Sequence, residues 1–222
     1  MPAAAQQPDL FPRSARHIAL AGAKIDYVPT LYSAEQAREL FAAVRNDAGI
    51  SWHSDPIKMF GRLVKQPRMT AWMADTGVEY GYSGLRLAAA PWTQVVSRIR
   101  QAVEQAAGAA FNSVLINLYS DGNDYMGWHR DDERELGMQP VIASLSLGAT
   151  RFFDLRHRDY RESGIAVQRL ELQSGDLVVM RGDTQRHWQH RVPKQRRVTE
   201  ARINLSFRFV QGSDRDCLPQ LP

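Results

Sequence analysis

Beyond Gly108 the chain is a series of short apolar segments separated by turn residues, and this pattern limits the possible folds most strongly. Six segments are typical of strands, over residues 113–119, 141–148, 150–156, 165–172, 176–180 and 202–210. Short strands at fairly regular spacing are typical of an antiparallel sandwich or barrel. We therefore predict a double-stranded β-helix, or jelly roll, over about residues 112–210.

Two amphipathic helices are predicted before these strands, over Ser33–Ala48 and Pro91–Ala107. Ser33 and Gln36 have the spacing of a capping box, and apolar residues follow at helical intervals. Gly49 fits the stop of the first helix, and the second has proline in its first turn. The fold class expected is α+β, with the N-terminal helices packed on the jelly roll.

The expected organisation is one domain with a short segment at each end. Residues 1–30 are predicted to be a flexible extension, 31–212 the domain and 213–222 a tail. Residues 60–84, within a longer segment of about 52–84, are rich in Gly, Pro and aromatic residues without a clean period. Long irregular segments are often functional, so we predict that 52–84 forms a lid over a site.

Composition favours some classes of protein and excludes others. The 28 Lys and Arg against 24 Asp and Glu, with seven of the basic residues between Arg181 and Arg202, are compatible with nucleic-acid binding or with a solvated surface. The single cysteine, Cys217, excludes an internal disulfide framework and a cysteine-based zinc site, and a reducing cytoplasm is expected. No apolar run is as long as the roughly 18 residues of a transmembrane helix.

His129 and Asp131, in "GWHRDDERE", are candidate metal ligands. In an extended chain, two residues separated by one lie on the same face, about 6.6 Å apart along the strand. A site with two histidines and one carboxylate needs another histidine, and spacing alone leaves both His187 and His190 open. The alternative is a charged surface turn with Trp128 packed beneath it.

The segment "RINLSFR" alternates between polar and apolar residues, which indicates a strand with two different faces. One face carries Arg202, Asn204, Ser206 and Arg208. An arginine that points into a barrel is costly unless it meets an anion, so a small dicarboxylate is one interpretation. An edge strand with a solvated polar face is the other. "LINLY" aligns Asn117 with Tyr119 in the same manner.

Four segments in order, "LINLYSDGNDYMGWHRDDERE", "IASLSLGATRFF", "HWQHRVP" and "RINLSFR", resemble the AlkB family of iron- and 2-oxoglutarate-dependent dioxygenases. The resemblance covers roughly residues 50–210. It is closest to the branch with animal homologues that act on duplex DNA. It implies an enzyme that uses Fe(II), 2-oxoglutarate and O₂ to remove N-methyl groups from 1-methyladenine and 3-methylcytosine, releasing formaldehyde, succinate and CO₂.

The resemblance also implies roles for individual residues. His129, Asp131 and His190 match the iron ligands, and Arg208 joins them as catalytic. The residues that match the 2-oxoglutarate site are Asn117, Tyr119, Arg202, Asn204, Ser206 and Arg208. Those expected to contact the extruded base or the DNA around it are Phe60, Arg68, Tyr80, Tyr82, Ser83, Asp132 and Glu133. The enzyme is expected to be a monomer, and its expected partner is DNA. RNA, another oxygenase substrate, a cupin-like metal enzyme and an inactive binding module remain the alternatives.

Overall fold

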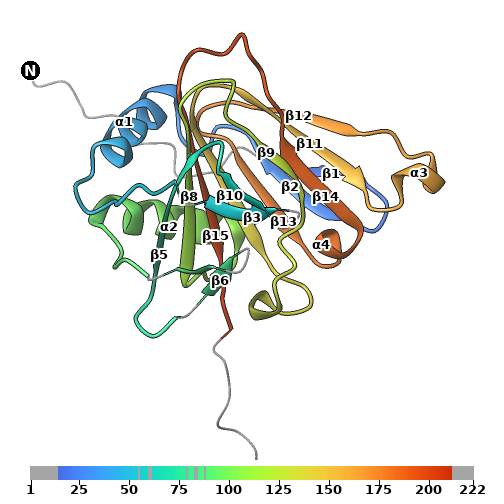
Figure 1. Cartoon of the computed structure of the whole chain (residues 1–222), viewed down its shortest axis with the longest axis horizontal. Helices are drawn as coiled ribbons and strands as arrows, with labels where there is room; N and C mark the ends of the chain where they lie inside the picture. The colour runs from blue at the N-terminus through green and yellow to red at the C-terminus, as the bar shows by residue number, and fades with distance from the viewer. Residues whose placement is uncertain are drawn as a thin grey trace, which may run out of the picture.

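The computed structural model consists of two antiparallel sheets that face each other, with two helices on the outside of the larger sheet (Figure 1). It describes residues 15–54, 56–59, 62–78, 80–82, 85–87 and 89–211. In these residues the larger sheet has the strand order β1 (Arg16–Ile18), β2 (Lys24–Val28), β13 (Leu177–Arg181), β10 (Ile142–Gly148), β15 (Arg202–Arg208), β8 (Ser113–Tyr119), β5 (Met69–Ala74). The smaller sheet has the order β12 (Gln168–Leu172), β11 (Arg151–His157), β14 (Trp188–Val192), β9 (Met126–His129). The predicted jelly roll is confirmed.

The six predicted strands are present, and three of them, β10, β12 and β15, are shorter than the apolar segments that predict them. β8 has the predicted bounds, whereas β12 begins at Gln168 and not at residue 165. β15 ends at Arg208 because the main-chain N–H and carbonyl of Val210 pair with the Asn112 side chain and not with a strand. The Asn112 amide donates to the Val210 carbonyl at 2.8 Å and accepts from the Val210 N–H at 2.7 Å.

Helix α1 (Ala34–Arg45) begins as predicted and ends earlier than predicted. The capping box of Ser33 and Gln36 is present. The predicted stop at Gly49 is wrong, because Asn46 already caps the helix. The Asp47 carboxylate then accepts from the Gly49 N–H at 2.9 Å, which holds these residues in a turn.

Helix α2 (Gln94–Ala107) begins three residues later than predicted. Pro91 lies outside it, because the Thr93 hydroxyl accepts from the Val96 N–H and forms the cap. Gly108 ends the helix with φ +57, a left-handed conformation that glycine adopts without strain. The remaining helical segments are short: η1 (Arg134–Leu136), α3 (Tyr160–Ser163) and α4 (Thr184–His187).

The predicted flexible extension over residues 1–30 is wrong for its second half. Residues 16–28 form β1 and β2, and β2 pairs with β13 so that Val28 lies opposite Leu177. Ile25 and Val28 are fully buried. The sequence pattern did not predict these two strands, because charged and polar residues interrupt their apolar residues. The partner strand of β2 also lies about 150 residues further along the chain, where Val179 is opposite Asp26.

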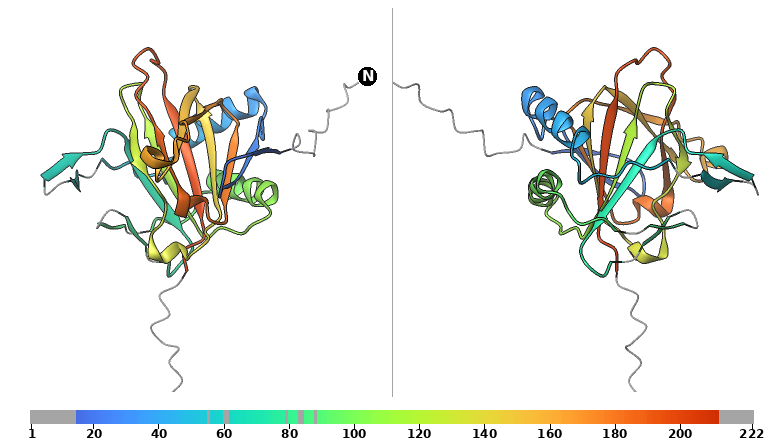
Figure 2. Two further views of the ribbon diagram at one scale, coloured as in Figure 1. Left: turned by 90° about the vertical axis from the view of Figure 1, so that its right-hand side faces the viewer. Right: turned by 60° about the vertical axis from the view of Figure 1, so that its left-hand side comes forward.

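The predicted lid over residues 52–84 also contains a strand of the core. β5 pairs with β8 along the edge of the larger sheet. The rest of the segment contains a short ribbon of β3 (Pro56–Met59) with β4 (Arg62–Lys65), and the strand β6 (Tyr80–Tyr82), which pairs with β7 (Leu85–Leu87) just after the segment. Figure 2 shows the β3–β4 ribbon standing out from the body of the two sheets.

Strand alternation divides the core into two layers. Ile203, Leu205 and Phe207 of β15 pack in the layer between the larger sheet and the helices. A second apolar layer lies between the two sheets. The four polar residues of β15 occupy the alternate positions and are also buried, so they lie on the side that faces the smaller sheet. Among the described residues, no helix has the length and apolar character that crossing a bilayer requires.

Candidate active site

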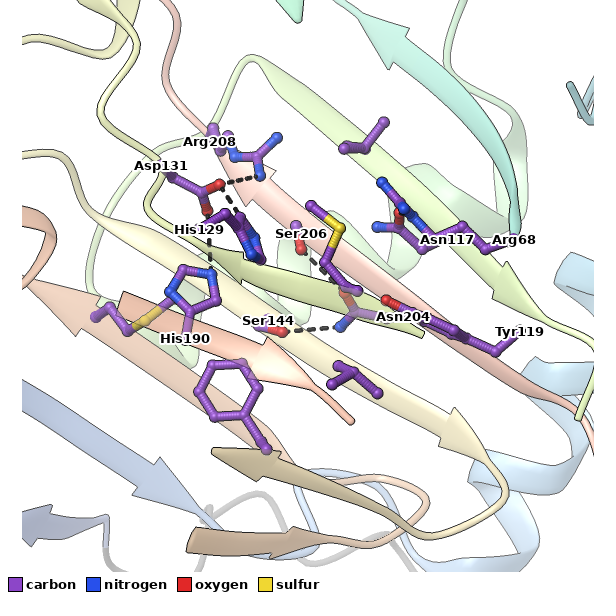
Figure 3. A pocket seen from close by; sticks show the side chains of 15 residues that line it. Arg68, Asn117, Tyr119, His129, Asp131, Ser144, His190, Asn204, Ser206 and Arg208 are labelled. Carbon is purple, nitrogen blue, oxygen red and sulfur yellow. Dashed lines mark hydrogen bonds and ion pairs between the residues drawn. The ribbon is translucent and has the colours of Figure 1, made fainter. Parts of the chain in front are cut away.

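Two side chains of the smaller sheet and one from the loop after β9 point toward one another (Figure 3). His129 ends β9 and His190 lies opposite it on β14, with ring centroids 4.2 Å apart. Asp131 follows β9, and its two carboxylate oxygens each lie 3.9 Å from one histidine Nε2. One potential ligand atom from each of the three residues lies within 4.8 Å of the others. Two imidazoles and one carboxylate are the donor set of non-haem Fe(II) oxygenases, so the residues fit that metal.

The protonation states of these residues also suit a metal. Burial lowers the pKa of His129, although Asp131 and the Gly127 carbonyl oppose this. Burial and the neighbouring His129 lower the pKa of His190 to about 3. Burial raises the pKa of Asp131, but Arg208 and both histidines outweigh it and bring that pKa to about 2. At neutral pH the carboxylate is therefore charged and the imidazoles are neutral, as ligation requires.

A main-chain contact orients the first histidine. Nδ1 of His129 lies 2.9 Å from the Gly127 carbonyl oxygen, which can only accept a hydrogen bond. Nδ1 therefore carries the proton, and the lone pair of Nε2 faces Asp131. The His190 ring stacks on Phe153 with centroids 5.2 Å apart. Both rings are thus held with Nε2 toward the carboxylate.

The structure decides between His187 and His190, which the sequence spacing left open as the second histidine ligand. His187 ends α4, and its ring stacks on His157 with centroids 6.1 Å apart. His190 is three residues further along and lies in the group with Asp131. In the described part of the chain, this group is the one set of three or more His, Cys, Asp or Glu residues close enough together to hold a metal ion.

Polar residues from the larger sheet line the same pocket. Asn117 and Tyr119 come from β8, and Asn204, Ser206 and Arg208 come from β15. Asn204 donates to the Ser144 hydroxyl at 2.8 Å and accepts from the Ser206 hydroxyl at 3.0 Å. These bonds fix the amide group of Asn204, so the polar wall of the pocket is ordered.

Arg202 is a buried cation next to this wall. It is 1% exposed, donates from Nη2 to the Ser146 hydroxyl at 2.9 Å, and lies 5.4 Å from the centroid of the Tyr119 ring. Its Nε and Nη1 have no hydrogen-bond partner in the described part of the chain. Burial lowers the pKa of Arg202 to about 10, although Tyr119 opposes this. A buried guanidinium with two unpaired N–H groups fits the carboxylate of a bound anion.

The model of the 2OG-Fe(II) oxygenase superfamily matches residues 24–208. The chain belongs to this superfamily. Fe(II), 2-oxoglutarate and O₂ are therefore its cofactor and cosubstrates, and it is a dioxygenase. The match includes β2, so it extends further toward the N-terminus than the resemblance noted in the sequence.

The oxygenase is similar to two groups of curated AlkB proteins. It is 38% identical over 200 residues to "DNA oxidative demethylase ALKBH2" of Mus musculus, covering 88% of this chain and 83% of the relative. For the Homo sapiens protein of that name the identity is 40%, over 88% and 76% of the two chains. "Alpha-ketoglutarate-dependent dioxygenase alkB homolog 3" of Homo sapiens is 41% identical over 157 residues, 68% of this chain and 54% of the relative.

A solved structure supports the fold of the oxygenase. "The structure of OsALKBH1" superposes with a TM-score of 0.60 over 86% of this chain and 99% of that chain. Its sequence identity is 14%, so the likeness concerns the fold alone. The predicted membership of the AlkB family is confirmed by the curated relatives and the superfamily match.

The residues expected to contact substrate are placed unevenly around the oxygenase pocket. Arg68 lines the pocket, is buried, and donates from Nε to the Asn117 side chain at 2.7 Å. Asp132 is exposed and pairs with Arg130, and Glu133 precedes η1. Asp132 and Glu133 are not among the described residues that line the pocket.

The other four expected contacts belong to the segment predicted as a lid. Tyr80 and Tyr82 lie in β6, which pairs with β7. The side chains of Tyr80 and Tyr82 lie outside the part of the chain that the structure describes. Phe60 and Ser83 lie outside the described residues. These four roles therefore stay predictions.

Several residues of the oxygenase site were not anticipated from the sequence. Ser144 lines the pocket, and Ser146 accepts from Arg202. The alternation in "IASLSLG" could have indicated both, since it places these serines on one face. Phe153 stacks on His190, and Gln185 accepts from the Asp131 N–H at 3.0 Å. No local pattern marks Gln185, because its partner lies 54 positions away.

Proposed function

We propose that this oxygenase repairs DNA by removing N-methyl groups from 1-methyladenine and 3-methylcytosine. The observation that carries the proposal is one pocket that joins a two-histidine, one-carboxylate group to a wall of buried polar and cationic side chains. Relatives about 40% identical are named DNA oxidative demethylases, which supports DNA as the substrate. Succinate, CO₂ and formaldehyde would be the other products.

His129, Asp131 and His190 are the proposed iron ligands. When bound, the iron supplies oxygen activation coupled to the oxidative decarboxylation of 2-oxoglutarate and to hydroxylation of the methyl C–H bond. An N-hydroxymethyl group then breaks down to formaldehyde and the unmodified base. The work of the protein is to hold the reactants in position and to keep water away from them.

The cosubstrate is proposed to bind between Arg202 and Arg208. Arg202 offers its unpaired Nε–H and Nη1–H to one carboxylate, and Arg208 lies at the metal end of the pocket beside Asp131. The remaining proposed contacts are Asn117, Tyr119, Asn204 and Ser206, which line the same wall. The apolar side chains of Met126, Phe153 and Val192 line the same pocket and limit its access to water.

A base in duplex DNA must leave the stack before its N-methyl group can reach this pocket. We assign the stacking and edge contacts to Tyr80, Tyr82 and Ser83, and the filling of the vacated space to Phe60. Arg68 lines the pocket, whereas Asp132 and Glu133 are not among the described residues that line it. We assign to the carboxylates of Asp132 and Glu133 a preference for the cationic 1-methyladenine and 3-methylcytosine over neutral bases.

Exposed cations after β14 support binding to a phosphate backbone. Of the seven basic residues predicted as a cluster, four are exposed: Arg186, Lys194, Arg196 and Arg197. Arg202 is buried beside the pocket, Arg191 pairs with Asp154, and Arg181 pairs with Asp26. We propose that the three exposed cations after β14, Lys194, Arg196 and Arg197, neutralise phosphates, so that affinity for DNA depends on salt. The single cysteine fits the proposed cytoplasmic location, and a monomer is the proposed state.

The test is repair of a 3-methylcytosine oligonucleotide, single-stranded and duplex, with Fe(II), 2-oxoglutarate and ascorbate. Methyl loss is followed by mass spectrometry alongside succinate. Methyl loss that needs 2-oxoglutarate supports the proposal, and the same assay on RNA tests the alternative substrate. Succinate without methyl loss from either would contradict the proposed substrate and keep the dioxygenase.

A further inference from the structure

The short helix α4 contacts the loop that carries Asp131 and leads directly into the strand that carries His190. α4 directly precedes β14, which carries His190. Its residue Gln185 is 3% exposed and accepts from the main-chain N–H of Asp131 at 3.0 Å. A single side chain of α4 therefore holds the backbone of the carboxylate ligand next to the strand of the second histidine.

α4 is itself firmly attached to the larger sheet. The Thr184 hydroxyl donates to the Arg181 carbonyl at 2.6 Å and accepts from the Lys24 N–H at 2.9 Å. The indole of Trp188, just after the helix, donates to the Ala21 carbonyl at 2.9 Å. The amide of Gln185 donates to the Met180 sulfur at 3.4 Å. Gln185 is thus a fixed acceptor.

Asp131 has particular need of such a contact. β9 ends at His129, so the main chain of Asp131 lies beyond the sheet ladder. Its carboxylate is pulled by Arg208, whose Nη2 lies 2.9 Å from Oδ1. If Gln185 offered no acceptor, the buried N–H of Asp131 would lose its hydrogen-bond partner, which is unfavourable in a buried position. The loop could then turn and let the carboxylate follow Arg208 away from the histidines.

We infer that Gln185 is a positioning residue, which fixes the backbone of Asp131 so that its carboxylate faces His129 and His190. It does not touch the metal or the substrate and acts through Asp131. Groups that orient a ligand in this way typically change metal affinity by 10- to 100-fold when they are replaced. The inference rests on the proposed metal ligands.

The experiment measures the affinity of the metal-free protein for Mn(II), by the electron paramagnetic resonance signal of the free ion. Gln185→Met keeps the length of the side chain and removes the acceptor, and we expect affinity about tenfold weaker. Gln185→Glu keeps an acceptor oxygen and should bind Mn(II) at least as tightly as the wild type. Gln189→Met is the matched control, since Gln189 accepts from Arg156 at 2.8 Å, and should leave the affinity unchanged.

The outcomes separate the inference from the proposed site. Wild-type affinity in Gln185→Met would overturn the role of Gln185, and so would an equal loss in Gln185→Glu. If Gln185→Met does not fold, Gln185→Asn replaces it, since its amide is one methylene too short to reach; wild-type affinity there would also overturn the role. Tight Mn(II) binding by His129→Ala would instead overturn the proposed metal ligands.

Discussion

Nη2 of Arg208 lies 2.9 Å from Oδ1 of Asp131, a direct ion pair between β15 and the loop that follows β9. The two sheets of the jelly roll are joined at this point by charge as well as by apolar packing. The pair ties the proposed cosubstrate wall to the proposed metal group. A change on either strand is therefore expected to affect both halves of the site.

His129→Ala should abolish turnover and leave the fold largely intact. The histidine lies at the end of β9, and its ring is part of the pocket wall, not of the main apolar layers. Succinate and formaldehyde release measure the first effect, and the midpoint of thermal unfolding measures the second. Full activity with added Fe(II) and 2-oxoglutarate would remove His129 from the site.

Arg202→Met should raise KM for 2-oxoglutarate by at least about tenfold, because a fork of charged hydrogen bonds to a carboxylate is lost. Initial rates of succinate release at varied 2-oxoglutarate check this. Arg161→Met, on the exposed face of α3, is the control and should leave KM unchanged. Equal KM values in Arg202→Met and the wild type would contradict the proposed carboxylate contact.

Asp154→Asn should destabilise the protein at neutral pH and matter little in acid. Burial raises the pKa of this fully buried carboxyl, but Arg169 and Arg191 outweigh it and lower that pKa below the unfolded value. A group with a lowered pKa contributes stability above its unfolded pKa, which it loses as pH falls through the folded pKa. We expect a loss of about 1–3 kcal/mol near pH 7 that shrinks below about pH 4.

Urea unfolding of both proteins from pH 7 to pH 3 measures this difference. A destabilisation that stays constant over the whole range would mean that packing, and not charge, explains the effect. Arg161→Met serves again as a surface control.

Arg196→Ser with Arg197→Ser should weaken DNA binding and its salt dependence. Each lost phosphate contact lowers the slope of log affinity against log salt by about 0.9, so the pair should lower it by about 2. Fluorescence anisotropy of a labelled duplex at several salt concentrations measures the slope. Arg38→Ser with Arg45→Ser, two exposed arginines at α1, is the matched control, and an equal effect there would indicate only net charge.

Phe60→Ala should lower repair of a duplex more than repair of a single strand. An aromatic side chain that fills the space of an extruded base has nothing to fill when the partner strand is absent. Rates on 3-methylcytosine in both contexts give the ratio. Equal losses on the two substrates would contradict this role for Phe60.

The sequence determined the features that depend on residues close together in the chain. Alternation in "RINLSFR" correctly placed Arg202 and Arg208 on the opposite face from Leu205, since successive side chains of a strand point to opposite faces. The capping box of Ser33 was equally local. His129 and Asp131 were found as a pair because the one-residue spacing that brings them together lies within a single short segment.

Only the tertiary structure decided what depends on distant pairing. It selected His190 over His187, because β14 aligns His190 opposite His129 while α4 turns His187 toward His157. It added β2 to the core through β13, and it brought Gln185 to Asp131. Periodicity specifies which face a side chain occupies. The burial and pairing of segments far apart in the chain specify what that face meets, and no local pattern contains that information.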